Sequence, residues 1–253
     1  MSRKILNFNS VLVALAITLA ACSPAATTSP TTAANAANAP TAGGPTATVD
    51  PAVAGANATS QSPCIGVQPV AGENIQPNGG GKWPAPDNVI DVNHVYCAIF
   101  TTNNGRIVAE LFPKIAPKNV NNFVFLAKNG FYENITWHRV LANFMAQSGD
   151  PTGTGAGGPG YENIPNETVS GVNYDREGRV GVARQTPPDT AGSQFFITFA
   201  PYPGGNGAYT IMGQVVEGLT VLHQIKLRNP DDPNAPKGDP LISVRIVDVG
   251  PAK

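Results

Sequence analysis

Short runs of apolar residues, separated by Gly, Pro and Asn, dominate the chain from residue 94 onward. Residues 95–102 and 106–112 form the first two runs, and the Asn104-Gly105 pair between them is typical of a type I′ hairpin turn, whose central residues need φ > 0. Further runs predict strands at 136–140, 144–147, 179–183, 195–198, 210–215 and 241–249. Many short strands with Gly/Pro turns indicate a closed antiparallel barrel.

Two segments have helical periodicity instead. Pro117 suits the first position of a helix, and apolar residues follow it at i, i+3, i+4 and i+7 spacing: Val120, Phe123, Val124 and Ala127. Gly130 then ends that helix. Leu219, Leu222 and Ile225 mark a second helix.

The N-terminus reads as an export signal. Arg3 and Lys4 precede a short apolar run at 11–19, which is too short for a comfortable membrane span of about 20 residues. The Leu-Ala-Ala-Cys sequence that ends at Cys22 resembles the bacterial lipobox, in which the cysteine carries acyl chains such as palmitate. A plain secretory signal, with Cys22 near the cut by chance, is the alternative.

The segments before the barrel differ in composition. We predict a signal peptide over residues 1–21 and a disordered Ala/Thr/Pro-rich tether over 22–63, because that tether has too little apolar area to offset its conformational entropy. Residues 64–93 form a Pro/Gly-rich approach with Trp83 as its one large anchor, and the folded domain occupies residues 94–253.

Composition restricts the partners. The chain has 253 residues and a net charge of -1, without a basic stripe, so we expect no nucleic-acid partner. Three cysteines leave one unpaired, and lipidation of Cys22 would resolve that parity. Cys64 and Cys97 would then form either a disulfide or two separate buried thiols.

A glycine-rich stretch at 153–160 matches G-x-G-x-x-G twice, but no helix pattern follows it. A dinucleotide site needs a helix N-terminus there, so a surface loop is the preferred interpretation. No metal-binding motif or P-loop occurs, and we expect no cofactor and no metal.

Two stretches bring chemistry together: WHRVLANFMAQSGD at residues 137–150 and GSQFFI at 192–197. Strand alternation places Arg139, Met145 and Gln147 on one face. A cation, an amide and large apolar groups on one surface predict a mixed pocket, apolar with a few polar groups.

These stretches resemble the cyclophilin signatures F-H-R-V-x-x-x-F-M-x-Q-G-G-D and G-S-Q-F-F-I, and the resemblance spans about residues 95–249. It implies an eight-stranded closed antiparallel β-barrel capped by two helices, with peptidyl-prolyl cis/trans isomerase activity. It also implies that Arg139 is catalytic and that substrate contacts come from Phe144, Met145, Gln147, Ala183, Arg184, Gln194, Phe196 and Tyr209.

Some residues keep a second interpretation. Arg139 taken alone could be a surface ion-pair partner, and Tyr209 could be plain barrel packing. The family's Trp-Leu-Asp-Gly loop is Gly-Gly-Asn-Gly at 204–207, and without the leucine the proline pocket should be more open on that side.

The resemblance implies an enzyme that rotates X-Pro bonds without cofactors, and the signal implies that its substrates are proline-containing peptides and unfolded exported proteins. We expect a monomer in the bacterial cell envelope, attached to the plasma membrane through its lipid anchor only. A proline-peptide binding module with weak catalysis is the alternative, favoured by the glycine loop at 204–207 alone.

Overall fold

The computed structural model describes residues 51–57, 61–73, 75–77 and 82–252. The signal segment, Cys22 and the first part of the predicted tether lie outside these residues. Within the described part, no helix has the length and apolarity to cross a membrane.

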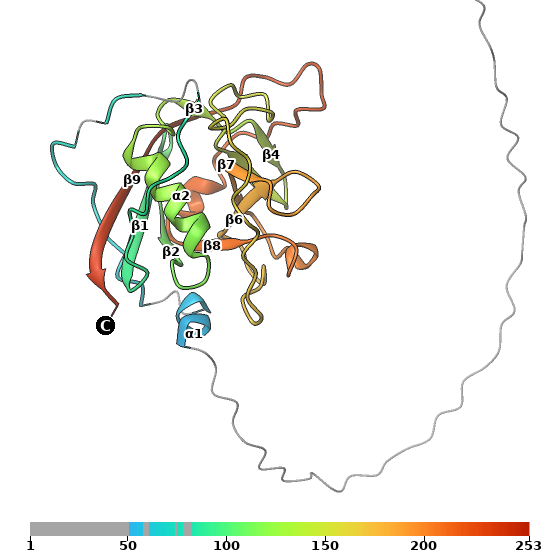
Figure 1. The fold of residues 1–253 in the computed structure, drawn as a ribbon. Helices are drawn as coiled ribbons and strands as arrows, with labels where there is room; N and C mark the ends of the chain where they lie inside the picture. Colours follow the sequence, from blue (N-terminus) through green and yellow to red (C-terminus); the bar gives the residue numbers. More distant parts are fainter. Residues whose placement is uncertain (1–50, 58–60, 74, 78–81, 253) are drawn as a thin grey trace, which may run out of the picture. The chain divides into compact units, whose positions relative to one another are not determined.

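One antiparallel sheet forms the body of the domain, and it curls back on itself (Figure 1). Its strands pair in the order β3-β9-β1-β2-β8-β6-β7-β5-β4. Their bounds are β1 His94–Thr102, β2 Gly105–Leu111, β3 Ile135–Thr136, β4 Arg139–Leu141, β5 Met145–Ser148, β6 Arg179–Arg184, β7 Ala191–Thr198, β8 Ile211–Glu217 and β9 Pro240–Pro251.

The mainly β antiparallel prediction is confirmed, but the described residues form nine strand segments where eight were expected. The predicted run at 136–140 is split, because Trp137 is completely buried and its backbone N–H bonds to Asp239 instead of to a neighbouring strand. The end strands β3 and β4 are therefore joined through Trp137 and His138. This chain connection links the two ends of the sheet, and β3 and β4 form no ladder with each other.

The first hairpin forms at the predicted place with a different turn. Thr102 pairs with Gly105, so the loop residues are Asn103 and Asn104, and neither has a positive φ. The Thr102 hydroxyl donates to the carbonyl of Gly105 and accepts from the N–H of Asn104. That side chain stabilises the loop in place of the type I′ geometry.

Helix α2 (Pro117–Lys128) covers the core as predicted and buries its apolar stripe. Gly130 follows it with a φ of 78°, and a Cβ there would lie 2.0 Å from the carbonyl oxygen of Gln76, so only glycine fits. Helix α3 (Leu219–Leu222) is shorter than predicted, and the turn η1 (Pro203–Gly205) precedes β8.

Helix α1 (Pro51–Asn57) corrects the prediction of disorder for residues 51–57, which are one part of the tether expected over 22–63. Val53 and Ala56 are buried against Phe112, Ile115 and Val172 of the barrel. The segment has little apolar area of its own, but docking supplies the buried surface that an isolated helix lacks.

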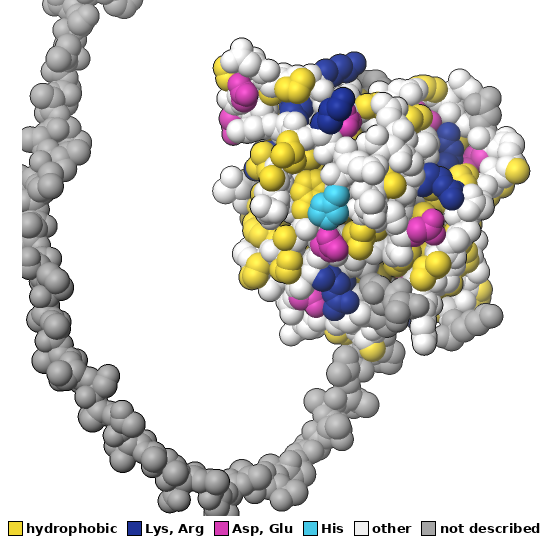
Figure 2. Space-filling view, turned by 180° about the vertical axis from the view of Figure 1, so that it is seen from behind, with side chains coloured by type: hydrophobic (Ala, Val, Ile, Leu, Met, Phe, Trp, Pro, Cys, Tyr) yellow, Lys and Arg dark blue, Asp and Glu magenta, His cyan; other side chains and the backbone are white. Residues whose placement is uncertain are grey.

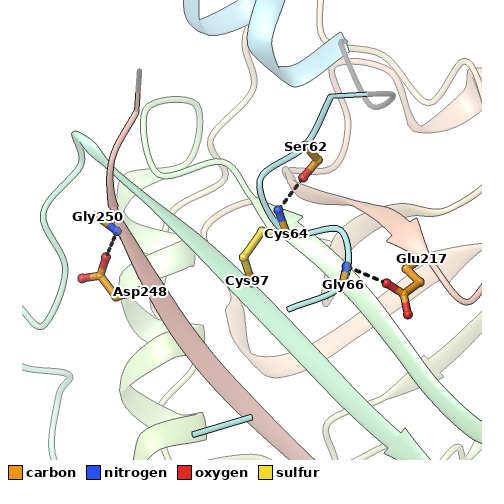
Figure 3. The surroundings of a disulfide bond; sticks show 7 residues. All are labelled: Ser62, Cys64, Gly66, Cys97, Glu217, Asp248 and Gly250. Carbon is orange, nitrogen blue, oxygen red and sulfur yellow. Dashed lines mark hydrogen bonds between the residues drawn. A yellow bond between two sulfur atoms is a disulfide. The ribbon is translucent and has the colours of Figure 1, made fainter. Parts of the chain in front are cut away.

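A disulfide joins Cys64 to Cys97 in β1 (Figure 3). Both residues are buried against Ile99 and Val108. Gly66 adds a second attachment, since its N–H donates to the Glu217 carboxylate at 2.9 Å. The approach segment is thus fastened to the outside of the sheet. Trp83 packs edge-on against Phe125 and Phe131, as its role of anchor predicts.

Candidate functional site

A single row of residues crosses four strands of the sheet. Arg139 in β4 pairs with Gln147 in β5, Gln147 pairs with Phe196 in β7, and Phe196 pairs with Gly181 in β6. Directly paired residues point to the same face of a sheet. A Cβ at Gly181 would lie 2.3 Å from the Phe196 ring, so the glycine leaves room for that ring.

The row forms part of a cavity of about 180 Å³. Its walls contain eight of the nine residues that the sequence placed at the site, with Tyr202 in addition: Arg139, Phe144, Met145, Gln147, Ala183, Arg184, Phe196, Tyr202 and Tyr209. Gln194 lies in the adjoining cavity. The structure therefore brings the sequence-predicted residues together at one place.

Tyr202 is the residue that the sequence analysis did not assign to the site. Its ring lies 4.9 Å from that of Phe144, edge to face. A Cβ at Gly205 would lie 2.7 Å from the Tyr202 ring, so a side chain at that position would displace Tyr202. The wall expected to be open beside the glycine loop therefore contains an aromatic ring.

Arg139 faces the cavity without an acidic partner. Its guanidinium carbon lies 5.5 Å from the centre of the Phe144 ring, and Nη1 lies 3.9 Å from Met145 Sδ. Among the described residues no carboxylate lies within ion-pair distance of Arg139. The interpretation of Arg139 as a surface ion-pair partner has no support here, and its N–H donors face the cavity.

Gln147 and Gln194 connect the cavity to the glycine-rich loop. Gln147 Nε2 donates to Gln194 Oε1 at 2.8 Å, and Gln194 Nε2 donates to the carbonyls of Gly155 and Gly157, each at 2.9 Å. The loop at 153–160 thus has a structural role beside the site. That agrees with its interpretation as a surface loop and not a nucleotide site.

Asp150 holds the start of the same loop. Burial raises the pKa of Asp150, but hydrogen bonds from Thr152 and from backbone N–H groups of the loop outweigh it and bring that pKa to about 2. The carboxylate accepts from the N–H groups of Thr152, Thr154 and Gly155. Such hydrogen bonds favour the charged form.

Arg184 and Tyr209 form the opposite wall. The Arg184 guanidinium lies 4.8 Å from the centre of the Tyr209 ring and donates to the carbonyls of Gln185, Thr186 and Ala208. Tyr209 meets Phe196 edge-on at 5.9 Å. Tyr209 therefore both packs on the barrel and lines the cavity, and Arg184 separates this cavity from its neighbour.

The neighbouring cavity has a volume of about 330 Å³. Gln147, Ala183 and Arg184 line both cavities, whereas Gln194, Glu162 and Gln185 line the neighbouring one alone. His138 is buried beneath the glycine-rich loop, and burial lowers its pKa, so its imidazole is neutral at pH 7.

Charge does not gather into one patch on the surface that Figure 2 draws. Over the described part of that face, Lys and Arg side chains are interspersed with Asp and Glu (Figure 2).

Comparison with known proteins agrees with the family resemblance seen in the sequence. The family model described as "Cyclophilin type peptidyl-prolyl cis-trans isomerase/CLD" matches residues 97–250. A peptidyl-prolyl cis-trans isomerase of Helicobacter pylori is 47% identical over 131 residues, which are 51% of this chain and 79% of that protein. A peptidyl-prolyl cis-trans isomerase-like 1 protein of Aspergillus fumigatus is 38% identical over 155 residues, 60% of this chain and 96% of its own.

Solved structures agree with the sequence relatives. A cyclophilin-type isomerase of Cryptosporidium parvum superposes with a TM-score of 0.54 at 34% identity, covering 61% of this chain and 97% of its own. The same protein crystallised in the presence of the dipeptide Ala-Pro also gives a TM-score of 0.54 at 34% identity, covering 60% of this chain and 98% of its own.

Proposed function

This chain belongs to the cyclophilin family of peptidyl-prolyl cis/trans isomerases, and from that premise we propose that it rotates X-Pro bonds at the cavity around Arg139. The observation that carries the proposal is the row Arg139, Gln147, Phe196. It places an unpaired guanidinium, an amide and an aromatic ring on one face of the sheet.

The chemistry needs no bond to break. Rotation about a peptide bond costs about 18–20 kcal/mol, because resonance gives the C–N bond partial double-bond character. A guanidinium directed at the prolyl nitrogen donates to the lone pair of the twisted amide, which the planar ground state does not offer. Arg139 would thus bind the transition state more tightly than the substrate.

Apolar residues hold the proline ring while the preceding carbonyl rotates. Met145 and Phe196 are buried at the base of the cavity, and Phe144 and Tyr202 form its side. Gln147 supplies a polar group for the substrate backbone. A cavity of about 180 Å³ is large enough for a proline ring and its neighbouring peptide groups, but not for a folded chain.

A coupled proline-isomerisation assay on an Ala-Pro peptide tests this function. We expect isomerisation to be faster than the spontaneous reaction, which takes tens to hundreds of seconds. A folded protein that binds the peptide without accelerating isomerisation would favour the binding-module alternative. The glycine loop, which had favoured that alternative, is now explained by Tyr202, whose ring lies where a Gly205 side chain would project.

We further infer that the substrates are exported proteins and that the enzyme is anchored to the outer face of the plasma membrane through Cys22. The lipobox-like sequence supports the anchor, and the Cys64–Cys97 disulfide is typical of an oxidising compartment. Two or three acyl chains would anchor stably, where a single chain would not.

Cys22→Ser tests the anchor, with Ser23→Ala as the matched control. We expect Cys22→Ser to leave the membrane fraction or to remain unprocessed, while Ser23→Ala behaves as the wild type. Normal processing and membrane retention of Cys22→Ser would show that Cys22 carries no lipid.

A further inference from the structure

We propose that helix α1 is a positioning element for the proline cavity, so that the tether regulates the site as well as carrying the domain. This proposal rests on the assignment of the active cavity above. Nothing in the cyclophilin signatures includes residues 51–57, since the family match begins at residue 97.

Arg179 holds α1 against the barrel. Its side chain is completely buried, and Nη1 donates to the carbonyl of Ala56 at 2.7 Å, while Nη2 donates to Oδ1 of Asn57 at 2.8 Å. The remaining partner is Asp175, at 2.9 Å from Nη2. Burial lowers the pKa of Arg179, and α1 supplies two of the acceptors that make such burial tolerable.

Helix α1 also contacts the segment at residues 171–176. Val53 packs on Val172, and Asn57 Nδ2 donates to the carbonyl of Gly171 at 3.2 Å. Asp175 pairs with Arg179 and Arg176, and Arg176 Nη1 donates to the carbonyl of Asn57 at 3.0 Å. The segment 171–176 is therefore attached to α1 at both ends, with Val172 and Tyr174 buried and Gly171, Asn173 and Asp175 exposed.

Tyr174, in the middle of that segment, lies directly behind the cavity. Its buried ring stacks on Phe196 with centroids 5.7 Å apart and also contacts Tyr202 at 5.8 Å. Its backbone carbonyl accepts from the N–H of Tyr202 at 2.8 Å. Two walls of the cavity thus rest on one residue, and α1 fixes the segment that carries it.

Gly55 offers a matched pair of variants in the full-length chain. It is exposed on α1, and a Cβ there would meet nothing within 4 Å. Gly55→Pro removes a helix hydrogen bond, whereas Gly55→Ala favours the helix. A second pair puts the same charge on opposite faces, with Val53→Asp on the buried face and Ala54→Asp on the exposed one.

We expect Gly55→Pro and Val53→Asp to lower kcat/KM on an Ala-Pro peptide by about fivefold or more, mainly through KM, because the cavity walls shift. Hydrogen exchange of residues 172–176 should accelerate in both. Gly55→Ala, Ala54→Asp and the conservative Val53→Ile should stay within about twofold of wild type.

The double variant Val53→Asp, Gly55→Pro removes both the helix and its apolar contact. Faster exchange of residues 53–57 in that variant, together with wild-type kcat and KM, would overturn the proposal. A fall in kcat that equals the loss of folded protein, with KM unchanged, would also overturn the proposal, because α1 would then act on stability alone. An inactive wild type would instead refute the proposed function, and exchange of residues 172–176 would still decide whether α1 holds them.

Discussion

The side-chain amide of Gln147 donates to Oε1 of Gln194 across the β5–β7 pair, at 2.8 Å. Because Gln194 is itself bonded to the carbonyls of Gly155 and Gly157, it fixes which way the Gln147 amide faces. Gln194 is thus the link between the row of Arg139, Gln147 and Phe196 and the loop that borders it.

Gln194→Leu should lower kcat/KM by about tenfold, because the Gln147 amide loses its orientation and the loop loses two hydrogen bonds. The midpoint of thermal unfolding should fall by no more than the loss of those hydrogen bonds implies. Gln224→Leu, at an exposed position far along the chain from the cavity, is the matched control and should be neutral. Equal activity of the two variants would separate Gln194 from the site.

Arg139→Ala should lose about 10²–10³ in kcat, equivalent to about 2.7–4 kcal/mol, as expected for removal of one transition-state donor. Peptide binding should weaken less, since Phe144, Met145 and Phe196 remain. Arg139→Lys should recover little, because an ammonium cannot present the guanidinium fork.

The measurement is kcat/KM on an Ala-Pro peptide, with circular dichroism as the folding control and Arg106→Ala as a substitution of the same type in the first hairpin. A folded Arg139→Ala protein within about threefold of wild type would remove Arg139 from the mechanism.

Replacing both Cys64 and Cys97 by Ala should reduce the free energy of unfolding by about 3–4 kcal/mol, as the chain-entropy model gives for a closed loop of this size. The bridge spans 33 residues and joins the approach segment to β1, which is not one of the cavity strands. Activity should therefore stay within about twofold. Thiol labelling of the denatured, unreduced Cys22→Ser protein decides the pairing: two free thiols would contradict the disulfide.

Acid should destabilise the protein through Asp150. Its folded pKa of about 2 is below the ordinary value of 3.8, so the carboxylate stabilises the fold above about pH 4. That contribution, about 2 kcal/mol at 1.36 kcal/mol per pKa unit, is lost as the pH falls from about 4 to 2.

Asp150→Asn should therefore be less stable than wild type at pH 7 and should show a weaker fall in stability below pH 4. Urea unfolding at several pH values measures both effects. Asp231→Asn, at an exposed carboxylate, is the control. Parallel acid limbs in Asp150→Asn and wild type would exclude Asp150 as the source.

Much of the site follows from the order of residues along the chain. Alternation within a strand places Met145 and Gln147 on the same face of β5, and it likewise sets the face of β4 on which Arg139 lies. The cyclophilin signatures add Phe196. Residues two apart in a strand share a face wherever that strand lies, so these groupings need no knowledge of the neighbouring strands. The same local reasoning predicted α2 and its glycine end.

Only the tertiary structure decided what depends on contacts between distant segments. Parity left Cys64 and Cys97 as a bridge or two thiols, and the fold brought their Cα atoms to 5.4 Å. Residues 51–57 are too short and too weakly apolar to be helical alone, and they become α1 because Arg179, more than 120 residues later, binds Ala56 and Asn57. Tyr202 could not be assigned for the same reason: its place in the cavity depends on Phe144 and Gly205, and packing partners of this kind have no local periodicity to reveal them.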